Sequence, residues 1–335
     1  MKVSEFDYRL PPEFIAQTPA EKRDHSRLMV LDRGNQNLEH RMFFNIVDYL
    51  FPGDVLVLND TKVVPASISG IKEGGSARIE VLLVKQREPS IWECLVKPGK
   101  RLKAGARIIF GQGELIGKVI EKLESGEQLI EFEGDLEGYM REKGEIPLPP
   151  YIQKVESRKS KIENRYQTVY AEKEGATAAP TAGLHFTPEL LKKIKDKGVN
   201  IAYLTLHTGL ATFKPVYAEN VEEHKMYPES YEIPAETIEA LKKAKRVIAV
   251  GTTTVRTLES YALDQKLKGT TGLYIYPGFK LKMVNAMITN FHFPRSTLLM
   301  LVSAFAGRDF IFRAYQKAME EGYRFFSFGD AMLIK

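Results

Sequence analysis

Three histidines lie at similar corners, where an apolar segment or a loop meets the start of a helix. His185 stands just before a helix that Thr187 and Pro188 introduce as a typical N-cap and first helical residue. His207 ends one apolar segment, and His292 follows another. An imidazole has an ordinary pKa of about 6.5, so it can exchange a proton near neutral pH. The corners therefore indicate positions where a ligand could bind, although a histidine at a strand end can also serve only as a cap.

The segment before His185 consists mainly of glycine, alanine and threonine and reads GATAAPTAGLHFT over 175–187. Small side chains let backbone N–H groups approach a ligand closely, and the helix N-terminus that follows adds partial positive charge beside the histidine. The same composition is ordinary in a packed turn. Segment 175–187 is therefore either the wall of a ligand site or a tight turn.

Two further stretches carry polar groups directly after apolar strands. Asp60 lies in the quartet NDTK at 59–62, which could be a ligand loop or simply a turn. Segment 251–254, GTTT, precedes Arg256 and could form a small anion nest for a carboxylate or phosphate, or only a threonine N-cap. It lacks the G-x-G-x-x-G pattern, which argues against a Rossmann dinucleotide site or an ordinary methyltransferase site.

The elements that must position these groups alternate between strands and helices. We expect strands at 28–31, 55–58, 199–206, 247–250, 287–290 and 323–328, and a strand or the approach to one at 165–171. We expect helices after Pro12 and at 44–50, 188–197, 236–245, 298–305 and 309–321. Because ligands of open α/β sheets bind beyond the carboxyl ends of the strands, the histidine corners and the threonine nest should converge on one edge of a sheet.

Residues 63–145 differ from the sequence on either side. Short β-rich segments recur between glycines at 77–84, 91–96, 107–110, 115–123 and 128–132, which predicts a small antiparallel barrel or sandwich. Such a module often binds nucleic acid and equally often only packs. The expected architecture is thus an α/β fold with a discontinuous catalytic domain, residues 1–62 and 146–335, and an inserted β-barrel domain, residues 63–145.

Composition narrows the class of protein. The 335 residues are 44% hydrophobic and 27% charged, as in soluble globular proteins of about two domains. Cys94 is the only cysteine, and the six histidines are not closely spaced, so we expect no disulfide and no metal site. The longest apolar run, 298–306, is too short to cross a membrane, and we expect a cytoplasmic protein. The net charge of +5 permits a polyanionic partner, with basic clusters at 97–107 and 154–165 that could also be solvated faces.

Seven longer motifs, in order along the chain, carry a resemblance to a known family. They are NDTKVVPA at 59–66, PLPPYI at 147–152, YQTVY at 166–170, AAPTAGLHF at 178–186, VGTT at 250–253, TNFH at 289–292 and MLVSAFAG at 300–307. Through them nearly the whole sequence resembles the S-adenosylmethionine:tRNA ribosyltransferase-isomerases of queuosine biosynthesis. The resemblance implies a catalytic α/β domain with an inserted barrel, no metal and no other cofactor. It further implies transfer and isomerisation of the ribosyl part of S-adenosylmethionine, a consumed co-substrate, onto 7-aminomethyl-7-deazaguanine at the tRNA wobble position, with loss of adenine and methionine.

This chemistry needs a base beside the sulfonium, stabilisation of the departing adenine and contacts to the methionine carboxylate. We expect His185 to be the base or a direct substrate contact, Asp60 to be a rival base, and His207 or His292 to act on adenine or the ribose hydroxyls. The expected S-adenosylmethionine contacts, with Phe186 at the sulfonium and Arg256 at the carboxylate, are Thr181, Gly183, Phe186, Gly251, Thr252, Thr253, Arg256 and Asn290.

For tRNA, the modified base must leave the anticodon loop while cationic side chains hold phosphates. The expected tRNA contacts are Lys62, Arg158, Arg165 and Tyr166. We expect a monomer. The alternatives are a non-enzymatic RNA-binding protein that uses the barrel, and a tRNA methyltransferase that would release S-adenosylhomocysteine.

Overall fold

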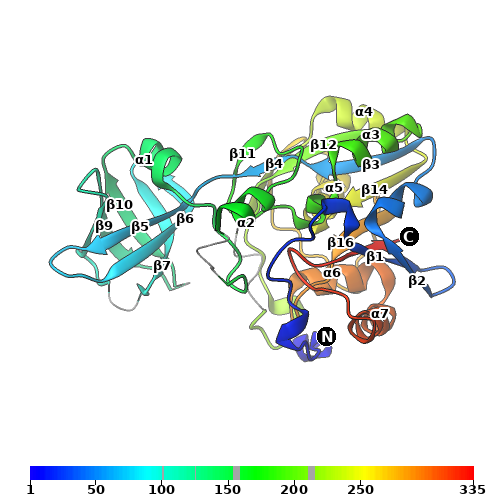
Figure 1. Ribbon diagram of the computed structural model, residues 1–335, viewed down its shortest axis with the longest axis horizontal. Coiled ribbons are helices and arrows are strands. Elements are labelled where there is room, and N and C mark those ends of the chain that lie inside the picture. The colour runs from blue at the N-terminus through cyan, green and yellow to red at the C-terminus, as the bar shows by residue number, and fades with distance from the viewer. Residues whose placement is uncertain (100–101, 125, 154–158, 210–215) are drawn as a thin grey trace. The chain divides into compact units, whose positions relative to one another are not determined.

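The computed structural model describes residues 1–99, 102–124, 126–153, 159–209 and 216–335, which form two compact units. One unit comprises residues 1–62 and 149–335, and the other comprises residues 63–148 (Figure 1). The first unit is built on a large mixed sheet and the second on a closed antiparallel barrel. The fold predicted from the sequence, an α/β protein with an inserted small β-barrel, is confirmed.

The described strands of the large sheet run in the order β15-β13-β12-β3-β14-β16-β17-β1-β2. Its four central strands, β12, β3, β14 and β16, are parallel to one another, whereas β17 runs antiparallel to β16 and parallel to β1. The bounds are β1 (Arg27–Asp32), β2 (Asn37–Met42), β3 (Asp54–Asn59), β12 (Asn200–Leu206), β13 (Glu229–Glu232), β14 (Arg246–Val250), β15 (Lys268–Thr271), β16 (Ala286–Asn290) and β17 (Ala331–Ile334). The carboxyl ends of the four central strands therefore share one edge of the sheet with the amino ends of β17 and β1.

Alternating residues of the strands supply two cores, one on each face of the sheet. In β3, Leu56 and Leu58 belong to one core while Val55 and Val57 belong to the other, as the period of two in a strand requires. Buried side chains of η4 (Phe43–Tyr49) and α3 (Pro188–Asp196) pack in the core of Leu56. Helices on the face of Val55 are α4 (Ala235–Lys243), α5 (Thr252–Asp264), α6 (Thr297–Ala306) and α7 (Arg308–Glu320).

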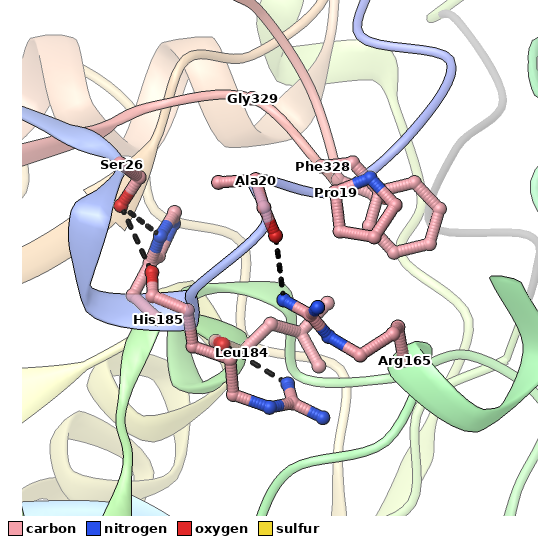
Figure 2. A pocket seen from close by; sticks show the side chains of 10 residues that line it. Pro19, Ala20, Ser26, Arg165, Leu184, His185, Phe328 and Gly329 are labelled. Carbon is pink, nitrogen blue, oxygen red and sulfur yellow. Dashed lines mark hydrogen bonds between the residues drawn. The ribbon is translucent and has the colours of Figure 1, made fainter. Parts of the chain in front are cut away.

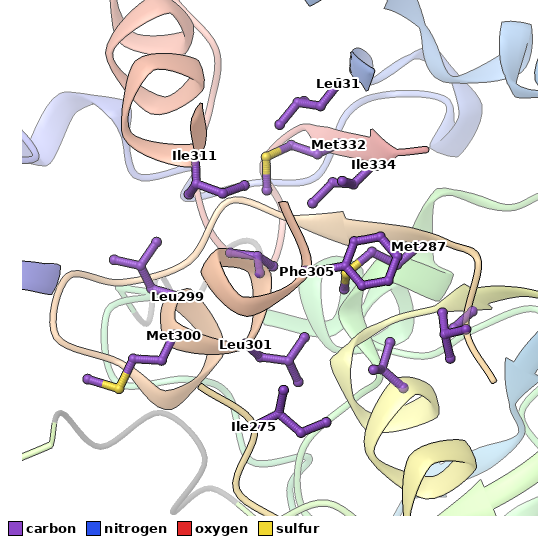
Figure 3. Packing of buried hydrophobic residues seen from close by; sticks show 14 of the residues in the cluster. Leu31, Ile275, Met287, Leu299, Met300, Leu301, Phe305, Ile311, Met332 and Ile334 are labelled. Atoms are coloured by element: carbon purple, nitrogen blue, oxygen red, sulfur yellow. The ribbon is translucent and has the colours of Figure 1, made fainter. Parts of the chain in front are cut away.

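Helix α6 is apolar over almost all of its surface because it lies between the sheet and α7. Leu301 and Phe305 of α6 belong to the same buried cluster as Met287 of β16 and Ile334 of β17 (Figure 3). Ser296 caps the helix by accepting a hydrogen bond from Leu299 N at 3.2 Å. This packing fixes the ends of β16 and β17, and with them the corner that carries Asn290. Among the described helices, none combines the length and the apolar composition needed to cross a bilayer.

The inserted unit closes in the strand order β10-β7-β6-β5-β8-β9. Ile79, Val81 and Leu83 of β6 are buried inside the barrel, and the residues between them are more exposed. The bounds are β5 (Ser67–Lys72), β6 (Arg78–Glu88), β7 (Ile91–Lys97), β8 (Arg107–Phe110), β9 (Leu115–Lys122), β10 (Gln128–Glu133) and α1 (Leu136–Lys143). The sequence prediction missed β5 and α1.

Two strand predictions in the first unit are wrong. Residues 165–171 contain no strand, because Arg165 ends α2 (Lys159–Arg165) and the chain then turns. Residues 323–328 form an irregular segment in which Phe325 packs against Phe291 at 4.8 Å between ring centroids. The last strand of the chain is β17 instead, and all of its residues are buried.

Candidate functional site

The side chain of Asn59 forms hydrogen bonds to three segments at one edge of the large sheet. Its Oδ1 accepts hydrogen bonds from Leu206 N at 3.0 Å and Thr61 N at 3.2 Å. Its Nδ2 donates to Leu206 O at 3.0 Å and to Thr253 Oγ1 at 3.3 Å. The ends of β3 and β12 and the start of α5 therefore meet at one place, as the pattern of strands and polar corners predicts.

Asp60 and His207 lie at this place. Asp60 is 6% exposed and accepts a hydrogen bond from Thr205 Oγ1 at 2.6 Å. Burial is the main cause that raises the pKa of its carboxyl group, with a smaller contribution from Glu172. His207 Nδ1 is hydrogen-bonded to Thr61 Oγ1 at 2.8 Å, and burial lowers the pKa of its ring. Together they place a carboxylate and a neutral imidazole at the ends of neighbouring strands.

Glycine is required next to His207. The small sheet of β4 (Thr61–Val63) and β11 (Lys173–Ala176) brings Gly175 against the imidazole ring. A Cβ on Gly175 would lie 2.9 Å from His207 Cε1, and its φ of +146° disfavours other residues. This glycine of segment 175–187 therefore serves close packing of a site histidine.

His185 is held through both ring nitrogens. It is the last residue of the 3₁₀ helix η7 (Thr181–His185) and is 4% exposed. Asn290 Nδ2 lies 3.1 Å from its Nε2 and also donates to Phe326 O at 3.1 Å, so the amide group donates to the ring. Nδ1 of His185 then donates to Ser26 Oγ at 2.7 Å (Figure 2). This hydrogen-bond network assigns the neutral tautomer that carries its proton on Nδ1.

The surroundings of His185 also favour the neutral ring. The ring stacks on Phe43 with 4.9 Å between centroids. Burial first, and then the positive charges of Arg324 and Arg23, lower its pKa to about 3. At neutral pH the ring is therefore an uncharged hydrogen-bond acceptor, and it is a weak base while Asn290 occupies its Nε2.

His292 is buried at the corner after β16. Its Nε2 is hydrogen-bonded to Thr289 Oγ1 at 2.9 Å, and its backbone N donates to Tyr315 OH at 2.9 Å. Tyr8 OH donates to its backbone oxygen, and burial lowers the pKa of the ring to about 3. These hydrogen bonds indicate that His292 stabilises the turn after β16. They favour a structural role over contact with the ribose.

The side chain of Arg256, which follows segment 251–254, is not accessible to a ligand. The side chain of Arg256 is 3% exposed and forms an ion pair with Glu229, and its Nε donates to Leu273 O at 3.1 Å. Gly251 N donates to Ile288 O at 2.8 Å, and Thr254 Oγ1 donates to Val250 O at 2.7 Å. The expected contact between Arg256 and a carboxylate is therefore not supported, because this guanidinium is already neutralised inside the protein. Thr252 and Thr253, each 7% exposed, remain at the edge.

Phe186 and Tyr166 are also buried away from any ligand. Phe186 is 0% exposed and meets Phe43 edge-on with 5.0 Å between ring centroids. Tyr166 is 0% exposed and packs edge-on against Phe328 at 5.9 Å. Neither ring can face a sulfonium or stack on a base in this arrangement, so both expected contacts lack support.

The other expected contacts fall at different places. Thr181 begins η7, and Gly183 within it lies so close to Tyr170 that a Cβ would be 2.1 Å from the phenol oxygen. Lys62 is exposed and pairs with Glu174 at 2.9 Å. Arg158 lies outside the described residues. In the described part of the chain, no three His, Cys, Asp or Glu side chains gather as a metal-ion site.

A small, open hollow of about 20 Å³ lies beside His185 (Figure 2). It is lined by Pro19, Ala20, Arg23, Ser26, Arg165, Leu184, His185, Ser327, Phe328 and Gly329. The sequence prediction included Arg165 and His185 but missed Arg23 and Ser26. Ser26 precedes β1, and this strand end reaches the site edge only because β1 runs antiparallel to β16.

Comparison with known proteins agrees with this fold. The family model described as "Queuosine biosynthesis protein" matches residues 3–334. The chain belongs to this family. The resemblance stated from the sequence motifs is thereby confirmed.

Individual relatives match over their full length. A protein of Halothermothrix orenii is 54% identical over 344 residues, and one of Thermotoga maritima is 53% identical over 342 residues. In both pairs the alignment covers 100% of each chain, and both relatives are named S-adenosylmethionine:tRNA ribosyltransferase-isomerase. A crystal structure of S-adenosylmethionine tRNA ribosyltransferase from Thermotoga maritima aligns with a TM-score of 0.57 at 44% identity, covering 99% of this chain and 100% of that one.

Loss of the Arg256–Glu229 ion pair should destabilise this family member without changing its affinity for S-adenosylmethionine. Arg256→Met breaks this buried ion pair by removing one partner, which typically costs about 3–5 kcal/mol of unfolding free energy. The double variant Arg256→Met/Glu229→Leu removes both charges and should recover much of this loss. Urea denaturation and calorimetric titration measure the two quantities. If Arg256→Met were as stable as wild type but bound S-adenosylmethionine more weakly, Arg256 would be a ligand contact after all.

Acid should weaken the contribution of His292 to stability. Its folded pKa of about 3 lies below the ordinary value of 6.5, so below pH 6.5 the unfolded chain binds a proton that the folded chain refuses. The stabilisation is therefore complete above pH 6.5 and is lost as pH falls towards 3. The stability difference between wild type and His292→Asn should shrink by about 2 kcal/mol from pH 8 to pH 5. A difference independent of pH, measured by urea denaturation, would contradict the neutral buried ring.

Proposed function

We propose that the protein transfers and isomerises the ribosyl moiety of S-adenosylmethionine onto 7-aminomethyl-7-deazaguanine at the tRNA wobble position. The products are epoxyqueuosine-tRNA, adenine and methionine. S-adenosylmethionine is consumed as a co-substrate, and no metal or further cofactor takes part. We also propose that the protein acts in the cytoplasm as a monomer. The full-length match to relatives that carry this enzyme name is the observation that supports the proposal most strongly.

The arrangement of the edge is compatible with two substrates side by side. His207 directly follows β12, and His185 is hydrogen-bonded to Asn290 at the end of β16, three strand positions away. Neighbouring strands are about 4.8 Å apart, so the two histidines mark positions about 14 Å apart along the edge. We propose that S-adenosylmethionine and the aminomethyl base lie along this edge, with the reacting carbon between Asp60 and His185.

Asp60 and His185 are the two candidate bases for the proton on the carbon beside the sulfonium. A raised pKa makes the Asp60 carboxylate a stronger base than an ordinary one, whereas the lowered pKa of His185 makes that ring a weaker one. We propose that Asp60 removes the proton and that His185 contacts the substrate directly through Nε2 after Asn290 yields its place. His207 then faces the departing adenine or a ribose hydroxyl.

Transfer RNA must present its modified base at this edge while cations hold its backbone. Lys62 lies two residues after Asp60, and its exposed pair with Glu174 contributes little to stability. A phosphate can therefore replace Glu174 at small cost. Lys62 and Arg165 are the proposed phosphate contacts among the described residues.

The products of the reaction test the proposal. Purified protein, S-adenosylmethionine and tRNA carrying 7-aminomethyl-7-deazaguanine should yield adenine and methionine in equal amounts, and tRNA with unmodified guanine should yield neither. Release of S-adenosylhomocysteine would indicate a methyltransferase. Binding of tRNA without any release would favour a non-enzymatic RNA-binding protein.

A further inference from the structure

Two arginines border the hollow beside His185, and none of its ten lining residues is acidic. Arg23 lies in η3 (Arg23–His25), and Arg165 ends α2. Across the described residues, neither arginine forms an ion pair with a carboxylate. Two cations in one hollow repel each other unless an anion binds between them. Clustered guanidinium groups are typical of sites for carboxylates and phosphates.

Among the described residues, Arg165 forms hydrogen bonds only to backbone oxygens, which leave its positive charge unpaired. Its two terminal nitrogens donate to Glu21 O at 3.0 Å and to Ala20 O at 2.9 Å. Figure 2 shows the contact with Ala20. The Nε of Arg165 is buried and has no hydrogen-bond partner in the described part of the chain. These carbonyl contacts fix the plane of the guanidinium but do not neutralise its charge, and they use two of its five N–H donors.

Arg23 is fixed in the same manner from the other side. It donates to Leu184 O at 3.0 Å and to Gln167 O at 2.8 Å. Burial, followed by repulsion from Arg165, lowers its pKa to about 10. The two cations are therefore close enough to sense each other, and both are pre-organised by backbone oxygens at a wall that includes Leu184, the neighbour of His185.

We propose that this hollow binds one anionic group of a substrate between Arg23 and Arg165, next to Ser26 and His185. The inference rests on the proposed function, because the group belongs to one of its two substrates. It is either the carboxylate of S-adenosylmethionine or a backbone phosphate of the tRNA. In both cases the bound anion fixes its substrate beside the histidine that closes η7.

Substitution by glutamine tests the site because it removes charge while keeping some hydrogen-bonding capacity. Arg23→Gln and Arg165→Gln are compared with Arg313→Gln, because Arg313 lies on α7, donates to Gln36 O and does not line the hollow. Calorimetry measures S-adenosylmethionine affinity, and a salt series measures tRNA affinity. We expect each hollow variant to bind one of the two substrates at least about tenfold more weakly, and the control to bind both as wild type does.

The two sources of the anion give different results. Weaker S-adenosylmethionine binding with unchanged tRNA binding indicates the carboxylate. Weaker tRNA binding, with a salt slope shallower by about one, indicates a phosphate. Unchanged affinity for both substrates overturns the proposal.

Two further measurements keep the test decisive. If the glutamine variants do not fold, Arg23→Met and Arg165→Met remove the charge but keep most of the apolar stem, and unchanged affinities in these variants would also overturn the site. Adenine release by the wild-type protein is recorded separately. Its absence would refute the proposed function, whereas wild-type release with unaffected variants would refute only the anion site.

Discussion

Replacing His185 by alanine should lower turnover by about 10² to 10⁴-fold while the domain remains folded. The imidazole joins Ser26, Asn290 and the ring of Phe43 at one point, so its loss removes both the substrate-facing nitrogen and the group that orders the corner. The variant leaves buried polar partners unsatisfied, which typically costs about 1–3 kcal/mol. Circular dichroism and adenine release separate the loss of stability from the loss of activity.

A matched histidine provides the control. His224 contacts Tyr274 and lies outside the sheet edge, so His224→Ala should keep normal turnover. His185→Gln offers an oxygen near Nε2 that can still accept from Asn290, and it should retain more stability than the alanine variant. Near-normal turnover of His185→Ala would exclude the residue from both catalysis and substrate contact.

Adding one methyl group at Gly183 should lower turnover by about 10²-fold. A Cβ there would lie 2.1 Å from Tyr170 OH and 2.8 Å from Thr168 Cγ2, so η7 must shift to admit it. His185 is two residues further along the same short helix and would move with it. A displacement of about 1 Å at a catalytic group is enough for such a loss. Turnover of Gly183→Ala is the measurement.

Two comparisons show whether the effect is steric. Among the described residues, a Cβ on Gly209 would first meet Thr177 Oγ1, at 4.0 Å, so Gly209→Ala should be tolerated. Tyr170→Phe removes the closest atom, so the double variant Gly183→Ala/Tyr170→Phe should recover part of the activity. Normal turnover of Gly183→Ala alone would show that η7 need not stay in place.

The convergence of the polar corners was predictable because it follows from the order of elements. Apolar strands that alternate with helices imply a parallel sheet, and polar residues after such strands must share an edge. Asn59, Thr253 and His207 meet for this reason. The same reasoning could not place Ser26 beside His185, because nothing local in the sequence shows that β1 and β17 run antiparallel to β16.

The predicted contacts that the structure does not support have one physical cause, which is that other groups of the protein already bind the same side chains. Arg256 follows a threonine nest and looks free in the sequence, yet Glu229, 27 residues away, neutralises it. Phe186 follows His185 directly, yet the turn of η7 directs it into the core beside Phe43. Whether a polar or aromatic side chain is available to a ligand depends on such distant contacts, which spacing along the chain does not reveal.

The most direct test of the account follows the ribosyl carbons. S-adenosylmethionine labelled with ¹³C in all five ribose carbons is incubated with the protein and tRNA carrying 7-aminomethyl-7-deazaguanine, and the tRNA nucleosides are then analysed by mass spectrometry. The account predicts that the modified wobble nucleoside gains all five labelled carbons. A nucleoside that gains no label, or that gains only the methyl group of methyl-labelled S-adenosylmethionine, would contradict it.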